Sequence, residues 1–263
     1  MFTWRPAYVP AAAASGRHGA PMEIVGHRGR PTPDTPENTL ASIEAALAEG
    51  ADGVEVDVRL TADGVAVCCH DAGLQRVAGV ARGVRTLTLA ELGAVRVGGH
   101  PMATVEDALR ALRGAGRLVL DLKPEQRGRA LLAAVAQALA TTDIPPPAIV
   151  LSSFDQTVLA ACAAMAPYLE RAVILTGAEP FSQVLSQAVA RGDSALHVPA
   201  RTVFGAPELV AAAHRHGLAV RVWTVNRTVD ARLLRLLDVD ALITDIPGEL
   251  RAALATNRPV PAG

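Results

Sequence analysis

Short runs of β-branched and apolar residues alternate along this chain with longer stretches whose apolar positions recur at helical spacing. Short apolar runs predict strands, and a period near 3.6 predicts helices. The pattern predicts strands at 23–27, 53–59, 65–70, 117–122, 148–152, 171–175, 194–198, 219–224 and 240–243. It predicts helices near 38–49, 104–113, 126–140, 155–166, 180–190, 206–216, 228–237 and 247–255. Such alternation is typical of a parallel α/β fold.

The ends of several predicted helices carry residues that start or stop a helix. Thr39, Asp155 and Pro207 stand where helices are expected to begin, and each residue type favours that position. Gly50 and Gly217 stand where helices are expected to end, since glycine adopts the left-handed conformation without strain. These positions support the helix boundaries that the periodicity predicts.

The simplest arrangement of these elements is a TIM (β/α)8 barrel that forms a single domain, with a short extra strand and a small insertion after strand 2. We expect the segment 65–70 to form the extra strand as a hairpin-like addition after 53–59. No linker divides the chain. We therefore expect a flexible leader at 1–21, the barrel at 22–256 and a C-terminal tail at 257–263.

Composition excludes several classes of partner. The 263 residues include 25 basic and 26 acidic ones, a net charge of -1, and only 3% are aromatic. Nucleic-acid binding and anionic-membrane binding need clustered positive charge, and stacking on bases needs exposed rings, so we expect neither partner. No apolar run reaches the roughly 18 residues of a membrane helix, so we expect no stable membrane insertion. The three cysteines lie in apolar segments, which predicts buried thiols and a cytoplasmic protein.

Reactive side chains gather at the predicted strand ends, where TIM barrels place their chemistry. The first strand ends in His27 and Arg28, and the extra strand ends in His70. Side chains two positions apart share one face of a strand, and two pairs of charged residues have this spacing. These pairs are Glu55 with Asp57 and Asp121 with Lys123.

Two interpretations compete for the carboxylates of Glu55, Asp57 and Asp121. They could form an internal salt-bridge network with Arg28 and Lys123 that needs no metal. They could instead hold a divalent cation, and an oxygen donor set without cysteine favours Mg²⁺, Mn²⁺ or Ca²⁺ over Zn²⁺. Either histidine alone could be structural. Both of them beside carboxylates and cations favour acid and base catalysis.

Several short motifs, in order, resemble the signature of the glycerophosphodiester phosphodiesterase family. They are Gly26-His27-Arg28-Gly29, Pro36-Glu37-Asn38-Thr39, Glu55-Val56-Asp57-Val58, Thr61-Ala62-Asp63-Gly64, His70-Asp71, Asp121-Leu122-Lys123, Ser152-Ser153-Phe154, Trp223-Thr224-Val225-Asn226 and Thr244-Asp245-Ile246-Pro247. Each motif alone is weakly specific, but their order and intervals from about residue 23 to 250 make a strong signal.

The resemblance implies a metal-dependent barrel hydrolase that cleaves glycerophosphodiesters to glycerol 3-phosphate and an alcohol. It implies metal ligands at Glu55, Asp57 and Asp121, and a general acid and base at His27 and His70. It further implies phosphate ligands at Arg28 and Lys123, a metal-ligating or orienting role for Glu37, and a pocket wall at Trp223. The cofactor would be Mg²⁺ or Ca²⁺, with Mn²⁺ as a third candidate, and the substrate a small molecule. We predict that His27 is the base and His70 the acid, with attack by water or by the substrate's own hydroxyl.

The chain departs from the family pattern at Asp121, where a glutamate is usual. The carboxylate is one methylene shorter, so a water could bridge it to the metal or the preferred ion could change, because Mg²⁺ is stricter about geometry than Ca²⁺.

Two other functions stay open at the sequence level. One is a phospholipase-like phosphodiesterase that forms a cyclic phosphate, and the other is a non-catalytic binding barrel. Both histidines are present, which disfavours the binding barrel. Asp245 and Asn226 are expected to brace loops at the barrel mouth. His197, near a strand end, is expected to be structural, as are His100 and His214.

Overall fold

The computed structural model describes residues 21–112, 116–124, 128–142 and 148–255 of the chain. The predicted leader and C-terminal tail lie outside these residues, apart from Pro21 at the end of the leader. Every helix of the described chain is too short or too polar to cross a lipid bilayer.

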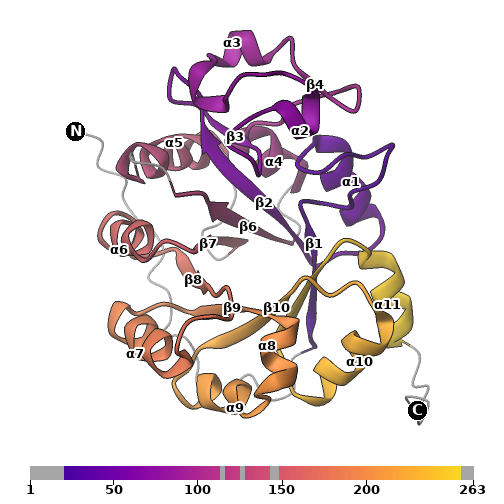
Figure 1. Ribbon diagram of the computed structural model, residues 1–263, viewed down its shortest axis with the longest axis vertical. Coiled ribbons are helices and arrows are strands. Elements are labelled where there is room, and N and C mark those ends of the chain that lie inside the picture. The colour runs from indigo at the N-terminus through magenta and orange to yellow at the C-terminus, as the bar shows by residue number, and fades with distance from the viewer. Residues whose placement is uncertain (1–20, 113–115, 125–127, 143–147, 256–263) are drawn as a thin grey trace.

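Parallel strands of the described chain close into an eight-stranded barrel, which confirms the predicted fold (Figure 1). In order around the barrel they are β1 (Glu23–His27), β2 (Gly53–Leu60), β6 (Arg117–Leu122), β7 (Ile149–Ser153), β8 (Glu170–Ile174), β9 (Ala195–Pro199), β10 (Ala219–Trp223) and β11 (Ala241–Thr244). β11 pairs with β1 and closes the ring. The extra strand, β3 (Ala66–Cys68), pairs antiparallel with β2 outside the ring, as expected.

Helices surround the ring of strands, as Figure 1 shows. They are α1 (Leu40–Ala48), α4 (Val105–Leu112), α5 (Gly128–Ala140), α6 (Gln156–Met165), α7 (Phe181–Arg191), α8 (Ala200–Gly205), α9 (Glu208–Arg215), α10 (Thr228–Leu236) and α11 (Pro247–Ala255). Thr39 and Asp155 cap α1 and α6 with their side chains, and Pro207 precedes α9, as predicted. The sequence pattern missed α8, because so short a helix shows no periodicity.

The insertion at 61–103 forms a small lobe at one edge of the barrel, at the top of Figure 1. After β3 it contains α2 (Gln75–Ala78), the 3₁₀ turn η1 (Val84–Thr86), α3 (Leu89–Leu92) and the hairpin β4 (Arg96–Val97) with β5 (His100–Pro101). A separate apolar core holds the lobe together, and it includes Leu74, Val84 and Leu92. The insertion was predicted, but its short internal elements were not, since none of them is long enough to show a period.

Alternation along the strands divides the side chains between two environments. Outward residues such as Val54, Val56 and Leu120 pack against the helices. Inward residues such as Val25, Val119 and Ala172 fill the middle of the barrel with a compact apolar layer. This layer separates two polar layers, one at each end of the barrel.

The polar layer at the amino ends of the strands is balanced by its own ion pairs. Arg117 pairs with Glu170 at 2.8 Å and with Glu23 at 3.2 Å, and Arg221 pairs with Glu170 at 3.1 Å. Each carboxylate there faces at least one guanidinium. The carboxyl ends of the strands carry a different arrangement.

Candidate active site

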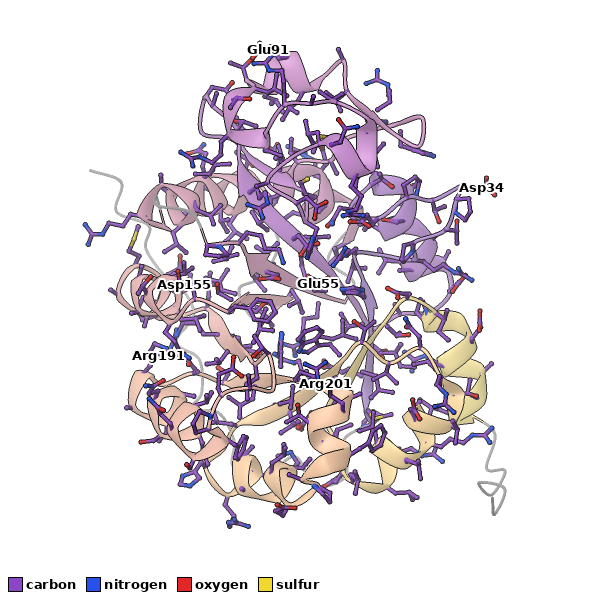
Figure 2. All side chains as sticks on the ribbon, viewed as in Figure 1. Asp34, Glu55, Glu91, Asp155, Arg191 and Arg201 are labelled. Atoms are coloured by element: carbon purple, nitrogen blue, oxygen red, sulfur yellow. The ribbon has the colours of Figure 1, made fainter. Side chains whose placement is uncertain are left out.

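Glu55, Asp57 and Asp121 meet inside the barrel at the carboxyl ends of β2 and β6. The strand register places Asp57 directly beside Asp121, and the two-residue period turns Glu55 to the same face. One oxygen of each carboxylate lies within 4.8 Å of the others, and all three residues are buried. Figure 2 shows Glu55 near the middle of the ring of strands. The sequence prediction that these three side chains converge is confirmed.

Two cations reach into this cluster. Lys123 Nζ lies 2.6 Å from Asp57 Oδ1 and 2.5 Å from Asp121 Oδ2. Arg28 forms an ion pair with Asp57, with Nε 3.2 Å from Oδ2, and the same oxygen accepts a 2.8 Å hydrogen bond from Asn38 Nδ2. The salt-bridge network considered from the sequence therefore exists, and Asp57 is its centre.

The network leaves the carboxylates of Glu55 and Asp121 with fewer hydrogen bonds and ion pairs than Asp57 has. Asp121 Oδ1 is buried and has no hydrogen-bond partner among the described residues. The hydrogen bond that reaches Glu55 comes from the backbone N–H of Arg28, at 3.0 Å to Oε2. Burial raises the pKa of Glu55 to about 7, helped by the charge of Asp57, and burial also raises the pKa of Asp121. For Asp57, Lys123 and Arg28 outweigh burial and lower the pKa.

These residues fit a hard divalent cation. The donors are carboxylate oxygens, which Mg²⁺, Mn²⁺ and Ca²⁺ prefer. The buried, unpartnered Oδ1 of Asp121 is an acceptor that a cation would satisfy. Internal cations and a metal are therefore compatible here, because Lys123 binds the opposite oxygen of Asp121.

The loop after β1 aims Arg28 at the cluster. Glycine is required at Gly26, within β1, and at Gly29, in the loop: an added Cβ on Gly26 would lie 2.6 Å from Gly29 O, and one on Gly29 would lie 2.4 Å from the backbone of Ser42. Arg28 itself has a φ of 57°, a conformation that costs energy for a residue with a side chain. In return its N–H contacts Glu55 and its guanidinium contacts Asp57 and Glu37.

His27 ends β1 beside Glu55 in the strand register. Its Nδ1 lies 2.7 Å from Asp245 Oδ1. Asn226 holds Asp245 in turn, since its Nδ2 donates to Asp245 Oδ2 and its Oδ1 accepts from the Asp245 backbone N–H at 2.9 Å. Burial lowers the pKa of His27, but the hydrogen bond of Asp245 and the charge of Glu55 outweigh it, so the net shift is upward. Asp245 was expected only to brace a loop, and the structure gives it a direct contact with a candidate catalytic group.

His70 lies in the insertion, just after β3. Its Nδ1 lies 2.7 Å from Asp71 Oδ1, so both candidate catalytic histidines are held at Nδ1 by a carboxylate. Asp71 Oδ2 accepts a 2.6 Å hydrogen bond from Arg76 Nε. The sequence analysis did not single out Arg76. Arg76 and His70 hold the pKa of Asp71 down at about 2.

Glu37 is separate from the three-carboxylate cluster in the described structure. Both of its oxygens are bound by Arg76 at 2.8 Å, and Oε1 also accepts from Arg28 at 3.0 Å. The sequence left two roles open for Glu37, as metal ligand or as orienting group. The geometry favours the orienting role, because Glu37 is not one of the three carboxylates that converge and it contacts Arg28 directly.

Trp223 ends β10 and forms an aromatic wall with Phe154. The two rings meet edge to face with centroids 5.8 Å apart, and Lys123 Nζ lies 5.9 Å from the centroid of Phe154. Trp223 Nε1 donates to the carbonyl of His197 at 3.2 Å, which fixes the indole. His197 itself is buried beside Arg221, at 3.4 Å, and burial lowers the pKa of its ring well below the usual range.

Most of the predicted site residues thus form one connected group. Ion pairs and hydrogen bonds link His70, Asp71, Arg76, Glu37, Arg28, Asp57, Lys123 and Asp121 in that order. The structure also brings to the site residues that the sequence analysis did not place there, namely Asn38, Asp71, Arg76, Asn226, Asp245 and Phe154. All of them except Arg76 lie within the motifs quoted in the sequence analysis. Membership in those motifs was therefore the signal that could have placed them in the site.

A family model and individual relatives were compared with this chain, and they agree on one family. Residues 27–249 match the model of the "Glycerophosphoryl diester phosphodiesterase family". A Mycobacterium tuberculosis protein named "Probable glycerophosphodiester phosphodiesterase 1" is 33% identical over 258 residues, with 89% of this chain and 93% of the relative covered. The "Glycerophosphodiester phosphodiesterase" of Caldanaerobacter subterraneus is 28% identical over 241 residues, covering 86% and 95%.

A solved structure adds a ligand to this comparison. The structure of an Oleispira antarctica phosphodiesterase, solved in complex with the product sn-glycerol-3-phosphate, superposes with a TM-score of 0.80 and 26% identity. The match covers 89% of this chain and 97% of that one.

Proposed function

The chain belongs to the glycerophosphoryl diester phosphodiesterase family and is an enzyme of that class, and on this premise we propose that it hydrolyses glycerophosphodiesters to glycerol 3-phosphate and an alcohol by metal-dependent, two-histidine catalysis. The observation that carries this proposal is the meeting of a buried acidic cluster with two carboxylate-bound histidines at the mouth of one barrel. The product bound in the Oleispira antarctica relative supports the same substrate class.

Glu55, Asp57 and Asp121 would hold the divalent ion, either Mg²⁺ or Ca²⁺, with Mn²⁺ as a third candidate. When bound, the ion supplies positive charge against the oxygens of the phosphodiester. Arg28 and Lys123 supply further positive charge from fixed positions, because both are already anchored to Asp57. Fixed cations stabilise the charge that builds up on the equatorial oxygens without reorganising during the reaction.

His27 and His70 would move the protons. In each ring Nδ1 faces a carboxylate, Asp245 or Asp71, so Nδ1 carries a proton and Nε2 is left for the substrate. We assign His27 as the base that takes a proton from the attacking hydroxyl. We assign His70 as the acid: its imidazolium form gives the Nε2 proton to the leaving alcohol, which is a poor leaving group without a proton, and keeps the Nδ1 proton toward Asp71.

Two further residues complete the proposed site. Trp223 would form the pocket wall for glycerol or the leaving group, and its ring is held by the His197 carbonyl and Phe154. Glu37 would orient Arg28 through their 3.0 Å contact. A cytoplasmic location is supported by the three cysteines, which are buried free thiols.

The test is release of glycerol 3-phosphate from glycerophosphocholine and related diesters, followed by phosphorus NMR so that a cyclic phosphate would be seen. We expect hydrolysis that stops after exhaustive treatment with EDTA and returns when Mg²⁺, Mn²⁺ or Ca²⁺ is added. His27→Ala and His70→Ala should each lose about 100-fold or more in kcat, the usual contribution of a positioned acid or base. Full activity after chelation, or in His27→Ala, would rule out the metal and histidine mechanism.

A further inference from the structure

Arg76 ties the insertion to the loop that follows β1, as does a 3.0 Å hydrogen bond between His100 Nε2 and the Asp34 carbonyl. Arg76 lies on α2, and its guanidinium binds two carboxylates that belong to different parts of the chain. Nε donates to Asp71 at 2.6 Å, while Nη1 and Nη2 donate to the two oxygens of Glu37 at 2.8 Å each. The contact with Glu37 is bidentate, which fixes the plane of the guanidinium as well as its position.

Each of these carboxylates makes a second contact with a group that the proposed reaction uses. Asp71 Oδ1 lies 2.7 Å from His70 Nδ1, and Glu37 Oε1 accepts from Arg28 Nη1 at 3.0 Å. Arg76 is therefore one residue removed from the proposed acid on one side and from a proposed phosphate ligand on the other. Its hydrogen bonds and ion pairs within the described chain go to Asp71 and Glu37 and not to Glu55, Asp57 or Asp121, so Arg76 lies outside the acidic cluster.

We propose that Arg76 is a positioning residue that sets the His70 ring through Asp71 and the Arg28 guanidinium through Glu37. This inference rests on the proposed function, since it needs His70 to act in proton transfer and Arg28 to bind phosphate. It makes the docking of the insertion onto the barrel a condition for assembling the active site. Arginine suits this position because its fork makes the bidentate contact with Glu37 while Nε still reaches Asp71. A lysine ammonium can bridge two carboxylates, as Lys123 does, but as a single point charge it cannot make a bidentate contact.

Because Arg76 is exposed, the effect of a substitution on positioning can be measured without a large effect on folding. Its side chain is 50% exposed, and ion pairs of exposed side chains contribute little to stability. A substitution there should therefore leave the protein folded. Arg82 offers a matched control in the same insertion: it is 49% exposed and pairs with Glu91, at the periphery of the lobe.

The experiment compares Arg76→Gln, Arg76→Lys and Arg82→Gln with the unmodified, metal-loaded protein. Steady-state kinetics on glycerophosphocholine give kcat, and calorimetry with glycerol 3-phosphate gives a Kd that does not depend on turnover. We expect both Arg76 variants to lose about 10-fold to 100-fold in kcat, the range for residues that orient a reacting group. Arg76→Gln should also weaken glycerol 3-phosphate binding by up to about fivefold. Arg82→Gln should match the unmodified protein in both.

Two further variants show how much of the loss arises through Asp71 and His70 and how much through Glu37 and Arg28. Asp71→Asn should reproduce the loss in kcat with unchanged binding, and Glu37→Gln should reproduce the weaker binding. In a His70→Ala background, Arg76→Gln should lose less in kcat than it does in the unmodified protein, because only the route through Glu37 and Arg28 is left, and it should still weaken binding. The same fold-loss in kcat with and without His70 would overturn the inference, because Arg76 would then act independently of His70.

The outcomes for this inference and for the proposed function are distinct. If the unmodified protein binds glycerol 3-phosphate but hydrolyses no diester, the proposed function fails. If it is active and Arg76→Gln stays within twofold of it in kcat and Kd, the inference fails. If Arg76→Gln unfolds, as thermal denaturation would show, a folded Arg76→Lys with unmodified kcat refutes the inference and one with reduced kcat supports it.

Discussion

Replacing Asp245 by asparagine tests how the structure controls His27. The substitution keeps the size of the side chain and removes its charge. Asn226 Nδ2 donates to Asp245 Oδ2, so the new amide would turn its oxygen toward Asn226 to keep that hydrogen bond. Its NH₂ group would then face His27 Nδ1, at the position of the present 2.7 Å contact. A donor at that position requires Nδ1 to be unprotonated, which moves the ring proton to Nε2, the atom proposed to face the substrate.

The expected loss follows from the hydrogen bond that is broken. A hydrogen bond to a charged group is worth about 1.5–3 kcal/mol net, which corresponds to about 10-fold to 150-fold in kcat. The pH dependence gives a second readout. Asp245 is one of the groups that raise the pKa of His27, so its neutralisation should lower that pKa. If His27 is the base, the acidic limb of the pH profile should move to lower pH, because the neutral ring persists further into acid.

The assay is the kcat of glycerol 3-phosphate release between pH 5 and 9, compared with Asp240→Asn. Asp240 makes a similar contact with a histidine away from the site, 2.8 Å from His214 Nε2, and its variant should keep the unmodified kcat. Equal kcat values for Asp245→Asn and the unmodified protein, with the same pH profile, would refute the claim that Asp245 sets the His27 tautomer.

Two other predictions concern the metal and the insertion. Asp121→Glu should change the order of affinities for Mg²⁺, Mn²⁺ and Ca²⁺, measured by calorimetry. The reason is that the carboxylate moves one methylene further toward the cluster. An identical order in both proteins would mean that side-chain length does not select the ion. Leu74→Ala should lower the free energy of unfolding by about 2–5 kcal/mol in urea, since Leu74 is fully buried in the core of the insertion. The matched control Leu236→Ala, at a side chain that is 73% exposed, should stay within about 0.5 kcal/mol, and equal losses would contradict this account of the insertion core.

The barrel followed from the sequence because its signals are local and repeat. Each strand is an apolar run, each long helix shows a period, and Thr39, Asp155 and Pro207 mark helix starts within a few residues. The short elements of the insertion and the helix α8 were missed because elements of two to six residues carry too little pattern.

The acidic cluster was also predictable, because it depends on a rule that holds for every parallel barrel. Glu55 and Asp57 share a face by the period of the strand, and Asp121 sits at the same level on its neighbour. The sequence alone placed these side chains at one mouth. It did not decide between a salt-bridge network and a metal site. The structure showed that, among the residues it describes, the network leaves Asp121 Oδ1 without a hydrogen-bond partner.

What the sequence by itself determined, then, is the barrel and the kinds of side chain at its mouth. Only the tertiary structure decided which partner each of them has. Asp245 is 218 residues from His27, and Arg76 is 39 residues from Glu37, yet each pair is in contact. Such pairings depend on barrel closure and on the docking of the insertion, which bring together segments that have no local relation. Strand and helix periods report the environment of one residue at a time, so they cannot report which distant carboxylate will orient a histidine.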